Sequence, residues 1–536
     1  MFSRLHGRIV GLALAGAIAL AAGTGGGAVA RAQATPFVQS ILLGAGDDAD
    51  LRAFYTARAF APFWTGRDQA ARRSALLAAL AGVEDHGLPA ARYDAAGLKA
   101  ALRQAHSVGD LGRLEIALTR AFLTYARDVQ SGLLTPAKLD PTMVRVVAHE
   151  PPASLLARFE AAEPRAFLRS LPPQWPEYAA LMREKIRLQD LIAQGGYGAP
   201  IPEDKLQPGD EGAAVIALRD RLVRLGYMAR SASRSYDARL TAAVVRFQRD
   251  HGLNADGVAG ASTLAEVNVP AEARLKSVVV AMERLRWMAG TDRGQTHIWV
   301  NEPDFTAKII QRGKVIFRTR AVIGKNAADT HSPEFSDFME YMVVNPSWGV
   351  PRSITVGEYL PLLQQDPTAV AHLQIVDDAG RIVPREAVNF AAYSAQSFPF
   401  DLRQPPSDGN ALGKVKFMFP NPYNIYLHDT PAKDLFAKET RAFSHGCIRL
   451  ADPFDFAHAL LAMQTDDPDG TFRAALNSGK ETTITLAHPL PVHLVYFTAW
   501  PDADGQIAWR RDVYGRDALI AEALVAAGVA LDGVQG

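Results

Sequence analysis

The sequence predicts a multidomain α+β protein with an α-helical scaffold, a small helical bundle and a β-rich domain that carries a long insertion. The first observation is length, because 536 residues exceed one hydrophobic core and domains hold roughly 100–200 residues. The second is that apolar residues recur every three or four positions in the N-terminal part, as in helices. The third is that this period shortens toward two after Thr296, as in strands.

The charge balance excludes several classes of protein. The 57 Lys and Arg residues equal the 57 Asp and Glu residues, and 48% of the chain is hydrophobic. A balanced surface offers no field for a polyanion, so nucleic acid is not an expected partner. The apolar fraction is also too high for a disordered chain. We therefore expect a globular protein.

The first 34 residues have the pattern of an export signal. Arg4 and Arg8 precede an uncharged apolar run over 9–22, and Ala32-Gln33-Ala34 fits a small-residue cleavage site. The apolar run is shorter than the ~20 residues that a membrane-spanning helix needs. We expect a signal peptide over 1–34 and a periplasmic mature protein. The alternative is an uncleaved signal, which would be the only contact with the membrane.

Residues 36–200 are predicted to form the helical scaffold. Leu114, Leu118 and Phe122 illustrate the spacing that places apolar side chains on one helix face. The aromatic segment 60–64 is interpreted as core rather than as a binding surface. No catalytic role is assigned to this region.

Two further elements precede the β-rich part. Residues 206–269 combine short helical patterns with glycines, such as Gly209 and Gly212, that suit tight turns. They are expected to form the small helical bundle. Residues 271–290 carry an amphipathic helical pattern and are expected to connect the modules.

Residues 295–480 are predicted to form the β-rich domain. The segment 309–316 places Gly313 between apolar residues and predicts a β-hairpin. Much of 351–413 is irregular and rich in Pro, Gly and aromatic residues, and so long a stretch within a domain is typical of a lid or binding loop. Residues 481–536 are expected to form a separate C-terminal segment.

Cys447 is the only cysteine of the chain, so no disulfide can form within it. A lone cysteine is more commonly a buried structural residue. The surroundings favour a nucleophile instead, because 444–447 reads Ser-His-Gly-Cys and His428 lies upstream on a predicted strand over 424–429. Alternation along that strand places Tyr426 and His428 on the same face.

This cysteine motif, with a histidine a short interval before it, resembles the catalytic signature of the L,D-transpeptidases. The resemblance is to the large Gram-negative members, and it covers nearly all of the chain after residue 34. It implies that 206–269 is a peptidoglycan-binding-like domain. It also implies that 295–480 is an L,D-transpeptidase catalytic domain with a lid insertion over 351–413.

The implied reaction joins peptidoglycan stem peptides. A donor tetrapeptide stem would acylate the cysteine and release D-Ala, and the side-chain amine of a neighbouring stem would then accept the acyl group in a 3→3 crosslink. Acylation by carbapenems is implied as well. The implied partners are the donor and acceptor stems, with cell-wall synthases as further candidates.

The resemblance also implies roles for individual residues. Cys447 is the nucleophile, His428 is the general base and acid, and the Gly446 backbone contributes to the oxyanion hole. A thiol of ordinary pKa is only a few per cent ionised near neutral pH, so a lowered Cys447 pKa is expected. The expected substrate-binding residues are Tyr426, His445, Arg449, Ser444 and Trp348.

Several alternatives stay open at this point. Trp348 is equally well interpreted as a residue that packs the lid hinge, and Arg449 as an internal hydrogen-bonding residue. His428, His445 and Cys447 are also ligand types that zinc prefers, although the resemblance implies no metal and no cofactor. The same acyl-enzyme would serve hydrolysis or exchange of the donor. Outside enzyme chemistry, the alternative is a catalytically silent wall-binding scaffold.

Overall fold

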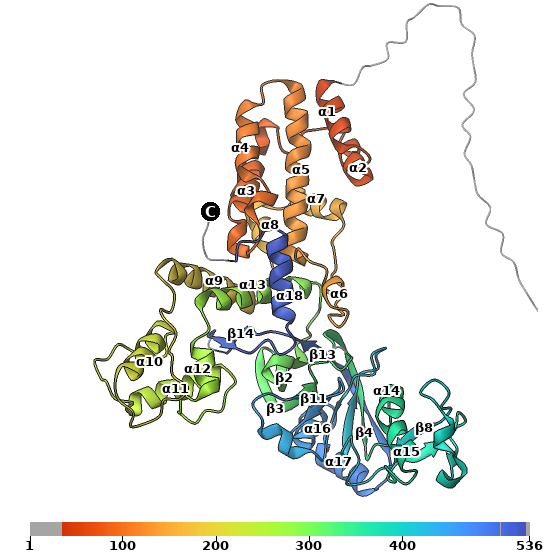
Figure 1. Ribbon diagram of the computed structural model, residues 1–536. Coiled ribbons are helices and arrows are strands. Elements are labelled where there is room, and N and C mark those ends of the chain that lie inside the picture. The colour runs from red at the N-terminus through yellow and green to blue at the C-terminus, as the bar shows by residue number, and fades with distance from the viewer. Residues whose placement is uncertain (1–34, 328, 504, 532–536) are drawn as a thin grey trace, which may run out of the picture.

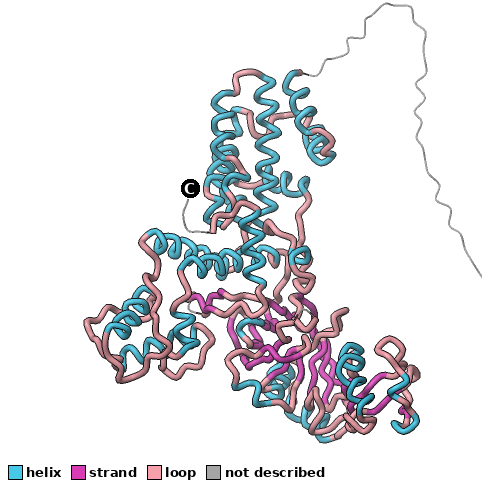
Figure 2. Tube along the Cα trace, in the orientation of Figure 1, coloured by secondary structure: helices cyan, strands magenta, loops and turns pink. Residues whose placement is uncertain are grey.

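The computed structural model describes residues 35–327, 329–503 and 505–531. The predicted signal peptide over 1–34 lies outside these residues. Figure 1 shows a helical tower above a central helical layer, with a small helical bundle to one side and a β-rich domain below. Figure 2 shows that strands are concentrated in the lower part. Among the described helices, none is long and apolar enough to cross a membrane. The predicted multidomain α+β architecture is confirmed.

The helical tower is built around its longest helix, α5 (Val108–Ser131). Ser107 and Asp110 form a capping box that satisfies free N–H groups at the start of this helix. Its buried Phe122 packs against Trp64 and Phe159, so the aromatic segment contributes to the core as predicted. The other helices of this region are α1 (Pro36–Ala45), α2 (Ala49–Ala57), α3 (Ala70–Ala81), α4 (Ala95–Gln104), α6 (Pro136–Leu139), α7 (Pro152–Ala161) and α8 (Pro164–Ser170).

A separate layer of three helices joins the tower to the β-rich domain. It consists of α9 (Pro176–Ala193), α13 (Ala271–Trp287) and α18 (Arg516–Ala526), which share one apolar core. The helix predicted from 271 is present, but its side chains are buried on nearly every side. α9 lies inside the predicted scaffold region 36–200 and packs on α13, because their apolar faces meet there.

The small bundle to the side contains α10 (Ala213–Arg224), α11 (Ala238–Asp250) and α12 (Ala261–Val267). Leu218, Val244 and Phe247 are among the fully buried residues of its own core. Gly209 and Gly212 both have positive φ, a conformation that glycine adopts without steric cost. The helical bundle predicted for this region is thus present.

The β-rich domain contains a nine-stranded mixed sheet in the order β11-β3-β12-β10-β9-β4-β13-β1-β2. β3 also pairs with β2, so the sheet closes on itself. The predicted hairpin is formed by β2 and β3, with Arg312 and Gly313 at positive φ in the turn. The strands are β1 (Thr296–Asn301), β2 (Thr306–Gln311), β3 (Lys314–Gly324), β4 (Phe335–Val344), β9 (Val415–Met418), β10 (Leu427–His428), β11 (Ala442–Ser444), β12 (Ile448–Leu450) and β13 (Thr482–Val495).

The C-terminal residues are not a separate segment, and this corrects the boundary expected at residue 480. β13 lies inside the sheet, antiparallel to β4 and parallel to β1. After it, β14 (Ala499–Pro501), β15 (Ile507–Trp509) and α18 pack on the central helical layer. Two helices, α16 (Pro453–Leu461) and α17 (Pro468–Asn477), contribute buried residues to the core of the sheet.

The insertion is a small folded unit rather than an irregular loop. Its apolar residues, including Leu363 and Leu402, form their own core. The expectation of an irregular stretch is wrong because short strands from distant positions pair here and leave no long local pattern. The unit contains β5 (Trp348–Gly349), α14 (Arg352–Ile354), a π-helical turn (Thr355–Tyr359), α15 (Leu360–Gln365), β6 (Gln374–Val376), β7 (Ile382–Val383) and β8 (Asp401–Gln404).

Candidate active site

Three neighbouring strands, β9, β10 and β12, bring the predicted site residues to one face of the sheet. His428 is paired with Lys416 on one side and with Arg449 on the other. Paired residues project to the same face of a sheet, and the intervening Leu427 and Ile448 are fully buried in the core on the opposite face. Strand pairing thus collects an imidazole and two cations beside the cysteine motif.

The motif forms a tight loop that only glycine accommodates at position 446. Gly446 has a φ of 115°, and a Cβ there would lie 3.2 Å from the Ile425 side chain. The Ser444 hydroxyl donates to the Cys447 carbonyl at 2.5 Å and accepts from the Gly446 N–H at 3.1 Å. Ser444 therefore braces the loop, and the Gly446 N–H is engaged within it.

The Cys447 thiol and the His428 ring are not hydrogen-bonded to one another. Among the described residues, the thiol donates to the Asn424 carbonyl, 3.5 Å away. The Cys447 N–H has no acceptor among the described residues. This amide is therefore left to bind an incoming oxygen.

His428 is oriented so that its Nε2 carries a lone pair. The ring is buried, with 4% exposure, and its Nδ1 lies 2.5 Å from the Asp429 carbonyl oxygen. A carbonyl oxygen only accepts hydrogen bonds, so Nδ1 carries the proton and Nε2 does not. The imidazole is therefore in the tautomer that a general base requires.

Burial controls the charge of both groups. It raises the pKa of the Cys447 thiol to about 11, and this effect exceeds the opposing hydrogen bonds from Tyr426 and the positive charges of Arg449 and Lys416. Burial, reinforced by Arg449, lowers the pKa of His428 to about 3. The expected lowering of the thiol pKa is therefore wrong for this structure, because desolvation disfavours the thiolate. A neutral thiol faces the site together with a neutral imidazole.

Among the described residues, neither of the two cations at the site forms an ion pair, although the charge of Glu481 opposes the effect of burial on the Lys416 pKa. The Arg449 side chain forms no hydrogen bond, and its buried Nε is unsatisfied. Lys416 contacts the Tyr426 ring, 5.9 Å from Nζ to the ring centroid. Burial lowers the pKa of both side chains. The alternative role of Arg449 as an internal hydrogen-bonding residue is not supported by these contacts.

The remaining predicted residues lie at different distances from the reaction centre. The Tyr426 ring is 5.7 Å from the His428 ring in an edge-on arrangement. Trp348 packs against the core of the lid, 6.5 Å from the Tyr359 ring. This placement matches the hinge-packing interpretation of Trp348.

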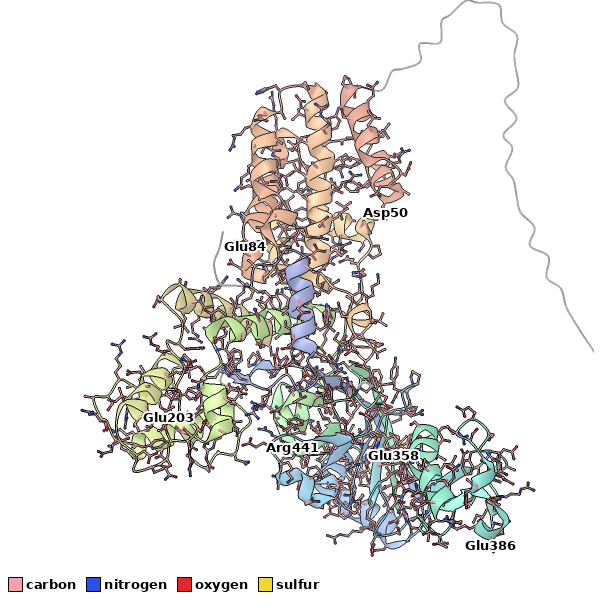
Figure 3. All side chains as sticks on the ribbon, in the orientation of Figure 1. Asp50, Glu84, Glu203, Glu358, Glu386 and Arg441 are labelled. Carbon is pink, nitrogen blue, oxygen red and sulfur yellow. The ribbon has the colours of Figure 1, made fainter. Side chains whose placement is uncertain are left out.

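His445 contacts the lid. Its Nε2 lies 2.7 Å from the Glu358 carboxylate and 3.3 Å from the Lys325 Nζ. Figure 3 shows Glu358 where the lid adjoins the catalytic domain. His445 thus joins the cysteine loop to the lid. Among the described residues, no group of three His, Cys, Asp or Glu side chains is placed to hold a metal.

Sequence analysis missed three contributors to this site. Lys416 alternates with buried Val415 and Phe417, but its side of the sheet becomes meaningful only once the strand register is known. Asn424 holds the thiol through its carbonyl and has a φ of 54°, which no side-chain motif reveals. Glu358 lies 87 positions before its partner His445, so nothing local links them.

The lowered His428 pKa predicts an acid-sensitive contribution to stability. In the unfolded state this imidazole becomes protonated below pH 6.5. In the folded state it stays neutral until the pH falls to its lowered pKa of about 3. Stability is thus lost as the pH falls, by about 1.4 kcal/mol per unit, or about 2 kcal/mol at pH 5.

This loss is best measured against a His428→Gln variant, because other buried groups titrate too, such as Glu302, whose pKa burial raises to about 8. We expect the difference in unfolding free energy between wild type and variant, from urea denaturation, to shift by that amount between pH 7 and 5. A difference independent of pH would contradict the buried neutral imidazole.

Comparison with known families identifies three regions. Residues 49–184 match a scaffold domain, residues 211–266 match a peptidoglycan binding domain, and residues 295–474 match an L,D-transpeptidase catalytic domain. The last match contains the cysteine motif, His428, Lys416 and the lid.

One curated relative and two solved structures are similar to parts of this chain. A Haemophilus influenzae protein described as "Putative L,D-transpeptidase" is 33% identical over 242 residues, which cover 44% of this chain and 47% of that protein. The chain thus matches about half the length of this curated relative. L,D-transpeptidase structures from Xylanimonas cellulosilytica and Stackebrandtia nassauensis are each 15% identical and cover 55% of this chain. They are covered over 100% and 97% of their own lengths, with TM-scores of 0.17 and 0.21.

Proposed function

We propose that the protein is an exported enzyme that forms 3→3 peptidoglycan crosslinks, because residues 295–474 match an L,D-transpeptidase catalytic domain. Cys447 is the nucleophile, and the substrate is a donor tetrapeptide stem. The acceptor is the side-chain amine of a neighbouring stem. The peptidoglycan-binding domain over 211–266 supports the cell wall as the place of action.

One observation carries the proposal: the strand that starts directly after Cys447 pairs with the strand that carries His428, whose Nε2 is free, and the Cys447 N–H has no acceptor among the described residues. In the first step the Cys447 sulfur attacks the carbonyl carbon before the terminal D-Ala, and its proton passes to His428 Nε2. The carbonyl oxygen becomes negative and accepts a hydrogen bond from the Cys447 N–H. The C–N bond then breaks, and His428 returns the proton to the departing D-Ala amine.

The second step reverses these roles. The acceptor amine gives its proton to His428 and attacks the thioester carbonyl. The C–S bond then breaks, the new amide is released, and His428 returns the proton to the Cys447 sulfur. A neutral thiol and a neutral imidazole suit this cycle, since each proton transfer is completed within the buried site.

Stem peptides carry carboxylates, and the two cations without partners are placed to bind them. A guanidinium pairs with a carboxylate through two parallel hydrogen bonds, and Arg449 has these donors free. A bound carboxylate would also offset the cost of keeping an unpaired cation half-buried. We assign Arg449 and Lys416 to substrate binding on this basis.

Product analysis tests the proposal. The purified protein is incubated with tetrapeptide-bearing muropeptides, and the products are separated and identified by mass spectrometry. We expect free D-Ala, an acyl adduct on the peptide that contains Cys447, and 3→3 linked dimers. Tripeptides without dimers would indicate hydrolysis instead of crosslinking. A chain that binds sacculi but forms no adduct would be a silent wall-binding scaffold.

A further inference from the structure

We propose that Ser332, held in place by Tyr514 and Arg516 from the C-terminal end of the chain, positions the Cys447 N–H for the developing oxyanion. This inference rests on the proposed acyl transfer. It concerns positioning residues, because none of the three contacts the reacting atoms. Two of them also lie outside the matched catalytic domain, which ends at residue 474.

Ser332 controls the peptide unit next to the nucleophile. It is fully buried, and its hydroxyl donates to the Gly446 carbonyl at 2.7 Å. That carbonyl and the Cys447 N–H belong to one peptide group, which is planar and trans, so they point in opposite directions. Anchoring the carbonyl therefore sets the direction of the N–H, which has no acceptor among the described residues.

Tyr514 ties the same serine to the end of β3. Its hydroxyl donates to the Gly324 carbonyl at 2.7 Å and accepts from the Ser332 N–H at 3.4 Å. The Gly324 N–H in turn donates to the Ser332 hydroxyl at 3.0 Å. Ser332 is thus held through its N–H and its side chain.

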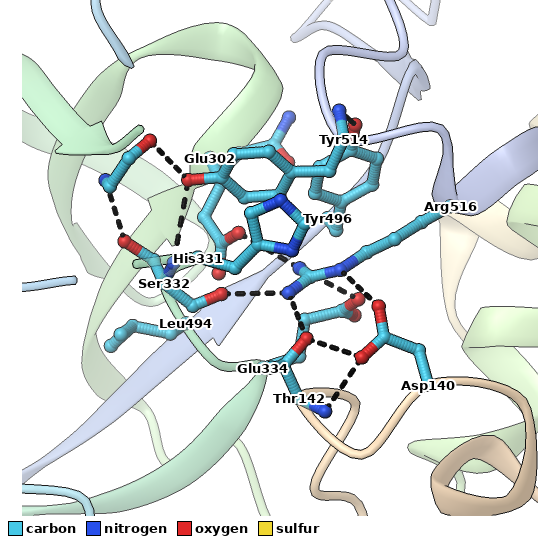
Figure 4. Close-up of polar contacts among 12 residues, drawn as sticks. Asp140, Thr142, Glu302, His331, Ser332, Glu334, Leu494, Tyr496, Tyr514 and Arg516 are labelled. Atoms are coloured by element: carbon cyan, nitrogen blue, oxygen red, sulfur yellow. Dashed lines mark hydrogen bonds and ion pairs between the residues drawn. The ribbon is translucent and has the colours of Figure 1, made fainter. Parts of the chain in front are cut away.

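Arg516 holds the third polar group of Ser332. This guanidinium is 1% exposed, and its Nη2 donates to the Ser332 carbonyl at 2.8 Å and to Thr142 at 2.6 Å. Figure 4 shows the arginine at the centre of these contacts, with Tyr514 above it, Ser332 on one side and Asp140 on the other. Its Nη1 binds Glu302 at 3.0 Å.

The position of Arg516 is set by several parts of the fold. Its Cζ lies 5.1 Å and 4.9 Å from the ring centroids of Tyr496 and Tyr514. Its Nη1 also binds Glu334, which bonds Arg284 of α13 at 2.6 Å. Buried, multiply bonded charges hold one geometry, because breaking one contact leaves a charge unpaired. The nucleophile loop is therefore linked through Ser332 by two hydrogen bonds to α18, and by a third to the Thr142 segment of the N-terminal region.

Two reactions of the Cys447 thiol distinguish loss of the oriented Cys447 N–H from general disruption of the site. Acylation by the tetrapeptide donor creates an oxyanion, whereas alkylation by iodoacetamide displaces iodide at a saturated carbon and creates none. For Ser332→Ala we expect acylation to slow about 10- to 100-fold, while alkylation keeps the wild-type rate. Ser332→Thr restores the hydroxyl and should recover much of the acylation rate.

Tyr514→Phe provides a second variant of nearly unchanged shape. We expect it to slow acylation without changing alkylation, but by a smaller factor than Ser332→Ala. Arg511→Lys is the matched control, because Arg511 lies on the same C-terminal segment but binds Glu266 of the small bundle. It should change neither rate. Equal slowing of both reactions in Ser332→Ala, or unchanged acylation, would overturn the inference. A wild type without any acyl-enzyme would contradict the proposed function itself, and the inference would fall with it.

Discussion

Replacing Cys447 with alanine is expected to abolish both the acyl adduct and the crosslinked product. The chain has no second cysteine, and no other group of the site face combines a nucleophilic atom with an adjacent proton acceptor. Intact-protein mass spectrometry after incubation with the tetrapeptide donor, or with a carbapenem, measures the adduct directly.

Cys447→Ser sharpens this test. The hydroxyl has nearly the same shape as the thiol but is a much weaker nucleophile without strong activation. A hydroxyl is also far less acidic than a thiol, so its proton passes to His428 much less readily and we expect this variant to be inactive as well. Adduct formation in either variant would place the acyl-enzyme on another residue and contradict the assignment.

His428→Gln is expected to slow acyl-enzyme formation by about 10²- to 10⁴-fold, the usual contribution of a general base. Glutamine retains a polar side chain but offers no Nε2 lone pair to take the thiol proton. The measurement is single-turnover acylation followed by mass spectrometry. His445→Gln is the matched comparison, since that ring contacts Glu358 of the lid. We expect this variant to reduce the rate of acyl-enzyme formation far less.

The pH dependence of the thiol tests the same arrangement. With a Cys447 pKa of about 11, the rate of iodoacetamide alkylation should keep rising with pH through the alkaline range. A preformed thiolate and imidazolium pair would instead give a plateau from about pH 6 upward. A plateau of that kind would contradict the neutral pair and would leave His428 as a counter-ion.

The chemistry of the site was largely predictable because its key residues are close in sequence. A thiol beside glycine and serine, with a histidine on a preceding strand, specifies a reaction class by residue type alone. The strand predicted over 424–429 is wrong in extent, because only Leu427–His428 pair and Asn424 has a positive φ, although the Tyr426 and His428 rings do lie 5.7 Å apart. Lys416 escaped detection because strand register, and not local pattern, places it beside that imidazole.

The folding pattern was predictable where a single segment carries its own period. The helix after 271 and the hairpin around Gly313 both follow from local spacing. The lid and the domain boundary near 480 were not predictable in this way. Short lid strands pair across long intervals, from Trp348 to Gln404 and from Gln374 to Arg403, and β13 joins a sheet whose other strands precede it.

The sequence by itself determined the order of the modules and predicted a nucleophile and its histidine, since both inferences need only residue identity and local periodicity. Tertiary structure alone decided the direction of the thiol pKa, because desolvation depends on every atom that surrounds the sulfur. It also decided that Arg516 braces the nucleophile loop, which lies about 70 residues earlier in the chain. Only folding brings such distant polar groups together and removes the water that would otherwise satisfy them.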